Sequence, residues 1–275
     1  MDPRSRVERV TFMVALIVAG EAVFSLPFHV ARFFRPTVLE VLGLTNTELG
    51  AVQSVYGVVA MLAYVPGGPL ADRFSARRLL TVSLLATSAG GLYFATFPPW
   101  GGLVVLFGFW GFSTILLFWA ALIRATRDWG GSSAQGRAFG LLDGGRGLFA
   151  AALAAAAVVL FQALLPGDPA QATGPERVRA LRGIITLYTA VTAGAGVLCW
   201  LFVQEPDDAA PLERDLLAHV RRVASMPRVW IQALIVVCAY VGYKGVDDYA
   251  LYAVEAYGMN ELDGAKVATL SAWVR

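Results

Sequence analysis

The sequence predicts an all-α membrane protein, and three observations support that fold class. Of its 275 residues, 57% are hydrophobic and 15% are charged, whereas a typical soluble domain has about 25% charged residues. The mean hydropathy is +0.61. Residues 49–71 and 79–123 contain no Asp, Glu, Lys or Arg. The chain therefore has too few charges to cover a soluble surface, and its apolar runs reach the roughly 20 residues that a membrane helix needs.

Seven apolar spans meet or approach that length, and an eighth begins near the end of the chain. The first covers 10–31 and can continue toward Leu42. Five more precede a long polar segment: 49–70, 79–97, 103–123, 139–165 and 183–203. A Pro-Pro-Trp-Gly-Gly break separates the third from the fourth, because proline cannot continue a regular helix. The seventh span starts near Val229, and the eighth near Gly264.

These spans predict three parts. Residues 1–203 form an N-terminal six-helix bundle, 204–228 a cytoplasmic linker, and 229–275 the beginning of a C-terminal bundle. In the linker we expect an amphipathic helix, because apolar residues recur on one face after Pro211, at Leu212, Leu216, Val220 and Val223. The segments on the same side of the membrane as the N-terminus contain more Lys and Arg than the segments on the other side. The positive-inside rule therefore predicts a cytoplasmic N-terminus.

The first span carries charges that are unusual inside a membrane. Glu21, Ser25, Phe28, Arg32 and Arg35 are spaced by three or four residues and so share one helical face. Charged residues within membrane spans usually face a cavity and have a functional role. The alternative is that the two arginines mark the outer end of the helix and extend into the lipid headgroups.

The fifth span also contains charges. Glycines at 140, 144 and 147 recur at helical spacing, which favours close helix packing. Asp143 and Arg146 are three residues apart and can pair with each other. Alternatively, Arg146 presents its charge to a central pathway.

The seventh span has a polar stripe, formed by Tyr240, Lys244, Asp247, Asp248, Leu251 and Glu255. Lys244 can reach both Asp247 and Asp248, but one ammonium cannot compensate two carboxylates. In a low-dielectric surrounding the uncompensated carboxylate favours its protonated form and can carry a proton. The alternative is that one of the two aspartates already reaches outside water.

Other residue types argue against several classes of function. Cys199 and Cys238 lie in apolar spans and are expected to be small buried hydrophobes. With His29 and His219 as the only histidines, no group has the spacing of a metal site, and no cofactor is expected. No nucleophile–base pair is visible, so we do not expect an enzyme. Scattered basic residues argue against nucleic acid as a partner.

The segment 68–78 resembles the signature of the major facilitator superfamily, G-x-L-x-D-R-x-G-R-R, with Ser75 and Ala76 replacing the usual glycine and basic residue. The D-R-x-x-x-R pattern of this segment is similar to that of the organophosphate:phosphate antiporter branch. Residues 240–249 resemble that branch's Y-x-x-R-Y-G-V-x-D-W, with Tyr243 at the position of the arginine and Lys244 one position later. Arg124 and the Gln-Gly that opens the fifth span resemble the branch's junction between helices 4 and 5.

The resemblance implies a fold of about twelve helices, built from two six-helix halves. It also implies secondary transport of a small polar solute, in particular an organic anion, by alternating access across the bacterial inner membrane. Coupling to protons or to a counter-transported anion is expected. Because the chain stops inside its eighth span, we expect it to be a fragment, with the remaining C-terminal helices and the lipid bilayer as partners.

The resemblance and the charges together predict roles for individual residues. The substrate-binding residues are expected to be Arg32, Arg146, Tyr243 and Lys244. The proton-coupling candidates are Glu21, Asp143, Asp247 and Asp248. The cytoplasmic gate motif contains Gly68, Asp72, Arg73 and Arg77. Two alternatives stay open: proton-driven efflux of hydrophobic compounds, and a solute sensor of the same fold that does not transport.

Overall fold

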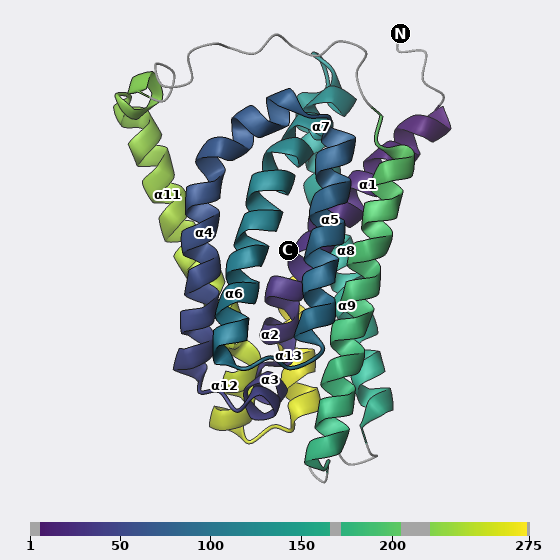
Figure 1. Cartoon of the computed structure of the whole chain (residues 1–275), viewed down its shortest axis with the longest axis vertical. Helices are drawn as coiled ribbons and strands as arrows, with labels where there is room; N and C mark the ends of the chain where they lie inside the picture. Colours follow the sequence, from purple (N-terminus) through teal and green to yellow (C-terminus); the bar gives the residue numbers. More distant parts are fainter. Residues whose placement is uncertain (1–5, 166–171, 205–220, 274–275) are drawn as a thin grey trace.

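The computed structural model describes residues 6–165, 172–204 and 221–273 (Figure 1). These residues form α-helices with short π- and 3₁₀-helical segments and no strand, which confirms the all-α fold. Within them, six helical runs are long and apolar enough to cross a membrane. The runs are Arg6–Phe33, Asn46–Arg73, Trp100–Gly130, Gln135–Leu164, Gly174–Phe202 and Pro227–Tyr257.

The first half of the chain contains the elements α1 (Arg6–Phe24), η1 (Ser25–His29), α2 (Val30–Phe33), α3 (Arg35–Leu42), α4 (Asn46–Arg73), α5 (Ala76–Phe94), α6 (Trp100–Gly111), η2 (Phe112–Trp119) and α7 (Ala120–Gly130). The second half contains α8 (Gln135–Leu164), α9 (Gly174–Phe202), α11 (Pro227–Lys244), η4 (Gly245–Asp248), α12 (Tyr249–Tyr257) and α13 (Glu261–Trp273).

Two sequence expectations need adjustment, and a third lies mostly outside the described residues. The third expected span, α5, is not among the six most apolar runs, since it opens with two arginines and carries several Ser and Thr residues. The sixth span begins at Gly174 rather than near 183, because the capping box of Thr173 and Glu176 starts the helix earlier. Most of the expected linker helix, residues 205–220, lies outside the described residues.

The helices of the first six spans pack in pairs. α1 contacts α8 and α9, α4 contacts α6 and η2, and α5 contacts α9. Gly111 permits the close approach of α6 to α4, because a Cβ at this position would lie 2.6 Å from the backbone oxygen of Tyr56. On α8 the close contact is at Gly145, which faces Ile17, whereas Gly140 and Gly144 of the expected glycine series face open space.

α5 is polar for a membrane helix, and its neighbours satisfy its hydroxyl groups. Ser83 donates to the backbone oxygen of Ser113 at 2.7 Å, and the hydroxyls of Thr87 and Ser113 lie 2.9 Å apart. Toward α9, Ser88 donates to the backbone oxygen of Thr189 at 3.2 Å. A polar group left without a partner in hydrocarbon is costly, so these bonds explain how a less apolar helix fits inside the bundle.

Two spans contain π-helical segments, η1 in the first and η2 in the fourth. Pro27 lies in η1, where its missing N–H interrupts the regular hydrogen-bond ladder. π-helical turns are rare and occur frequently at functional sites. The η1 segment changes the helical register between α1 and α2, and so determines where His29 and Arg32 point.

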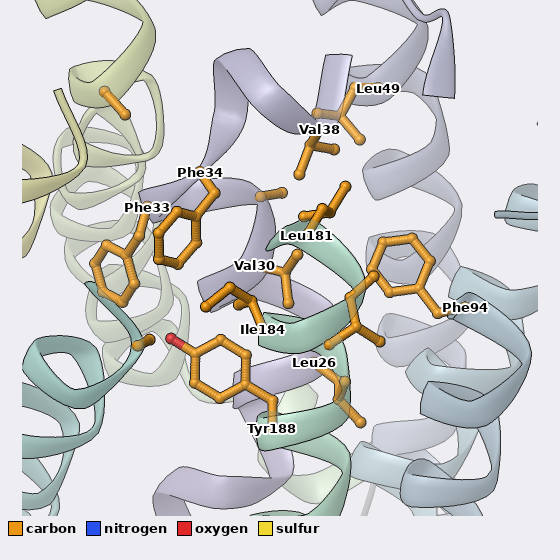
Figure 2. Packing of buried hydrophobic residues seen from close by; sticks show 14 of the residues in the cluster. Leu26, Val30, Phe33, Phe34, Val38, Leu49, Phe94, Leu181, Ile184 and Tyr188 are labelled. Carbon is orange, nitrogen blue, oxygen red and sulfur yellow. The ribbon is translucent and has the colours of Figure 1, made fainter. Parts of the chain in front are cut away.

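A buried apolar core joins the first span to α9. Figure 2 shows Leu26 and Val30 beside Leu181, Ile184 and Tyr188 of α9. All five side chains are at most 1% exposed. This packing fixes the segment that carries the charged residues of the first span.

The last helices meet this bundle at one end. α13 packs along α8 and touches α2, while α12 contacts α3 and α13. At the other end of the seventh run, α11 has no buried residue and lies at the outer side of the molecule (Figure 1). The contacts of the last helices are therefore concentrated at the end of the bundle remote from Arg6.

Candidate functional site

One charged cluster, here called the Arg32 cluster, joins the first span to the seventh. Arg32 Nε donates to Asp247 Oδ1 at 2.5 Å, and Arg32 Nη1 donates to the hydroxyl of Tyr243 at 2.7 Å. Lys244 Nζ pairs with the other carboxylate oxygen of Asp247. Arg32 is 8% exposed and Asp247 is 5% exposed. The cluster is therefore a network in which one carboxylate serves two cations, buried at Arg32 and Asp247 and 34% exposed at the Lys244 side chain.

The local backbone explains this geometry. α11 ends at Lys244, and the 3₁₀ turn η4 follows. Within this turn Asp247 faces Arg32 of α2, and Lys244, three residues before Asp247, reaches the same carboxylate. The Lys244 ammonium also lies 4.9 Å from the ring centroid of Phe28, a cation–π distance. The Arg32 guanidinium lies 5.1 Å from the Tyr243 ring centroid. Aromatic rings and one carboxylate thus surround two positive charges.

A second ion pair lies next to this cluster. Arg35 Nε is 3.2 Å from Asp248 Oδ1 and donates to Asn46 Oδ1 at 2.6 Å. The Asp248 side chain is 53% exposed, in contrast to that of Asp247. Lys244 pairs with Asp247, whereas Asp248 pairs with Arg35, so the two aspartates have different partners. Arg32 and Arg35 are both buried within the protein.

A different cluster, here called the Glu21 cluster, lies between α1, η1 and α8. Glu21 is 1% exposed, and its carboxylate lies 3.3 Å from His29 Nε2 and 3.5 Å from Arg146 Nη2. Arg146 Nη1 is also 3.3 Å from Asp143. Arg146 Nε donates to the backbone oxygen of Gly20 at 3.0 Å. A Cβ at Gly20 would lie 2.9 Å from Arg146 Cδ, so glycine allows this close contact.

The structure therefore divides the expected site residues into two groups. Arg32, Tyr243 and Lys244 lie together with Asp247, whereas Arg146 lies in the Glu21 cluster with Asp143. Sequence reasoning did not assign a role to His29. Its position was a usable signal, since it is the one histidine within an expected membrane span, eight residues after Glu21 in the same span.

The expected gate residues lie apart from both clusters. Asp72 and Arg73 are exposed at the end of α4, and the Arg73 guanidinium is 5.9 Å from the Phe74 ring centroid. Arg77 Nε donates to the backbone oxygen of Val203 at 2.7 Å and so ties α5 to the end of α9. Gly68 faces open space.

Comparison with known proteins gives a family and relatives. The family model described as Major Facilitator Superfamily matches residues 10–274. The chain is 29% identical to "Inner membrane protein YqcE" of Escherichia coli over 80% of this chain and 51% of that protein. It is 23% identical to "Inner membrane protein YihN" of the same organism, over 88% of this chain and 56% of that protein. The chain thus spans about half the length of these curated relatives.

Proposed function

Because the chain belongs to the Major Facilitator Superfamily, a family of membrane transporters, we propose that it takes part in secondary transport of a small organic anion across the bacterial inner membrane. The observation that carries this proposal is the Arg32 cluster. Two cations share one carboxylate there, and the neighbouring pair of Arg35 and Asp248 is neutral by itself. The cluster has an excess positive charge, and its Arg32 and Asp247 are buried, where uncompensated charge is costly. An anionic substrate group compensates it.

The Glu21 cluster supports proton coupling. Glu21 and Arg146 are buried and balance each other, whereas the Asp143 side chain is 70% exposed, so this cluster has no positive excess. Glu21 and His29 can share a proton there. The carboxylate–imidazole distance of 3.3 Å allows such sharing. In this proposal the anion and the proton bind at separate places along the same first span.

The contacts between the first bundle and the last helices support alternating access. Arg177 Nε lies 2.9 Å from Glu261 on α13, and Thr37 donates to the same carboxylate at 2.7 Å. These contacts, with the pair of Arg35 and Asp248, close the end remote from Arg6. With a cytoplasmic N-terminus, this closed end is the external gate, and Asp72 and Arg73 belong to the cytoplasmic gate.

The proposal extends to the chemical class of the substrate. The similarity to the organophosphate:phosphate antiporter branch favours a phosphate or carboxylate group as the anionic part of the substrate. Efflux of hydrophobic cations leaves the excess positive charge of the Arg32 cluster without a role. We therefore favour organic anions over that alternative.

Uptake by reconstituted vesicles tests the proposal. A panel of organic anions and hydrophobic cations is offered with and without an inward pH gradient. The proposal predicts accumulation of at least one anion, increased by the gradient. Accumulation or extrusion of cations alone contradicts it, and so does specific anion binding without any movement, which indicates a sensor.

A further inference from the structure

An aromatic strip connects the two charged clusters. It consists of Tyr56, Phe28, Phe24 and Trp119, which come from α4, η1, α1 and η2. The ring centroids of Phe28 and Tyr56 are 4.8 Å apart, those of Phe24 and Phe28 are 6.3 Å apart, and those of Phe24 and Trp119 are 6.0 Å apart. These distances lie within the range of interacting aromatic pairs. The strip is therefore continuous from ring to ring.

A cation lies at each end of the strip. Lys244 Nζ is 4.9 Å from the Phe28 centroid, and Arg146 Cζ is 5.7 Å from the Trp119 centroid. The two ends differ in charge balance, because Arg146 faces two carboxylates whereas Lys244 shares a single carboxylate with Arg32. Only the Lys244 end has a positive excess. A ligand that follows the strip thus meets one site for a negative group.

The rings of the strip can contact a ligand. Phe24, Phe28 and Trp119 are half-buried, whereas Tyr56 is 6% exposed and its hydroxyl is 2.6 Å from that of Thr114. Because this hydrogen bond holds Tyr56, its ring keeps a fixed position in its edge-on contact with Phe28. The rings of Phe24 and Phe28 carry no hydrogen-bonding group, so this part of the strip suits an apolar ring better than a ring that carries many hydroxyls.

We propose that the strip is a binding surface for the ring of an aromatic carboxylic acid, with the carboxylate held at Arg32 and Lys244. The proposal rests on the proposed function and narrows its substrate class. The ring lies against Phe28 and Phe24 and reaches toward Trp119. Occupancy of the Trp119 end brings the ligand next to Arg146, and so next to the proposed proton site.

Binding to the purified chain, measured calorimetrically in detergent, tests this inference. The probes are 3-phenylpropanoate, hexanoate and phenethylamine, which separate an aromatic anion from an aliphatic anion and an aromatic cation. We expect 3-phenylpropanoate to bind about tenfold more tightly than hexanoate, since one or two aromatic contacts correspond to roughly that factor. Trp119→Leu and Phe24→Leu should reduce this preference about fivefold, with hexanoate binding little changed.

Trp200→Leu is the matched control, because Trp200 is 52% exposed on α9 and lies outside the strip. Its binding profile should equal that of the unsubstituted protein. If the unsubstituted protein binds both acids with equal affinity, the strip does not bind the ring. The same follows if Trp119→Leu weakens the binding of both acids equally. Either result leaves the proposed anion site standing. Failure of both acids to bind, or binding of phenethylamine alone, instead rejects the anion site on which the proposed function depends.

Discussion

At the scale of single residues, neighbours in sequence have different surroundings. Asp247 and Asp248 are adjacent, yet Asp247 is buried between Arg32 and Lys244 whereas Asp248 is half exposed beside Arg35. The sequence indicates that both aspartates lie near Lys244. Which of them is buried depends on the 3₁₀ turn of η4, and helical spacing alone does not reveal that turn. Helical spacing therefore assigns a role to the pair of aspartates but not to either one of them.

The substitution Asp247→Asn tests this difference. It leaves the buried Arg32 and the partly exposed Lys244 without a carboxylate, and breaking a buried pair such as Arg32–Asp247 costs about 3–5 kcal/mol. Asp248→Asn removes a carboxylate that is exposed to water, where such pairs are worth about 0–1 kcal/mol. We expect a clearly lower midpoint of thermal unfolding in detergent for Asp247→Asn only. Equal midpoints for the two variants contradict the buried network.

The substitution Glu21→Gln tests the proton site. It removes the carboxylate that faces His29 and Arg146 while keeping the side chain's size. We expect loss of pH-driven accumulation in vesicles, with substrate exchange retained, because exchange needs no net proton movement. His29→Gln should act in the same direction. Glu255→Gln, at an exposed position on α12, is the control; if Glu21→Gln keeps full pH dependence, Glu21 is not the proton carrier.

At the scale of elements, the sequence predicts where helices lie better than how they face one another. Charge-free runs locate α4 to within about three residues at each end, because hydrocarbon thickness sets a minimum length. The fourth span, Trp100–Gly130, continues beyond the expected end at Ile123. The π-helical segments are not visible in the hydrophobic pattern. Since η1 changes the register after Phe24, the pairing of His29 with Glu21, and the separation of Arg146 from Arg32, could not be read from helical spacing.

Two glycines of α6 test the packing of the elements. A Cβ at Gly111 meets the backbone of α4 at 2.6 Å, whereas nothing lies within 4 Å of a Cβ at Gly101. Gly111→Ala should therefore lower stability by about 1–3 kcal/mol, the usual effect of overpacking. Gly101→Ala should leave stability unchanged or slightly raised, since alanine favours helix. Thermal unfolding in detergent compares the two, and a stable Gly111→Ala variant shows that α4 and α6 are less closely packed.

At the scale of the whole molecule, the contacts of the last helices with the first bundle are concentrated at one end. Arg177, Thr37 and Glu261 form the main polar contact there, and Arg177 also pairs with Glu40 at 3.1 Å. α11 contributes no buried residue at the other end. In our proposal this asymmetry corresponds to one state of an alternating-access cycle.

Charge reversal tests the closed end. Glu261→Lys places a cation against Arg177 and should open the contact between α13 and the bundle. The readout is maleimide labelling of Ala265→Cys, a position that is 1% exposed, in a background where the exposed Cys238 is Ser. We expect labelling several-fold faster in Glu261→Lys, and a return toward the original rate when Arg177→Glu is added. No change in labelling means that these charges do not hold the end closed.

Anion affinity of arginine and lysine variants tests the central claim most directly. Binding of the tightest anion from the panel is measured by calorimetry for Arg32→Gln, Lys244→Gln, Arg146→Gln and the exposed control Arg137→Gln. A charge-assisted hydrogen bond is worth about 1.5–3 kcal/mol, so Arg32→Gln and Lys244→Gln should each weaken binding roughly tenfold or more. Arg146→Gln should have a smaller effect and Arg137→Gln none. Unchanged affinity in both Arg32→Gln and Lys244→Gln would show that the Arg32 cluster does not bind the anion.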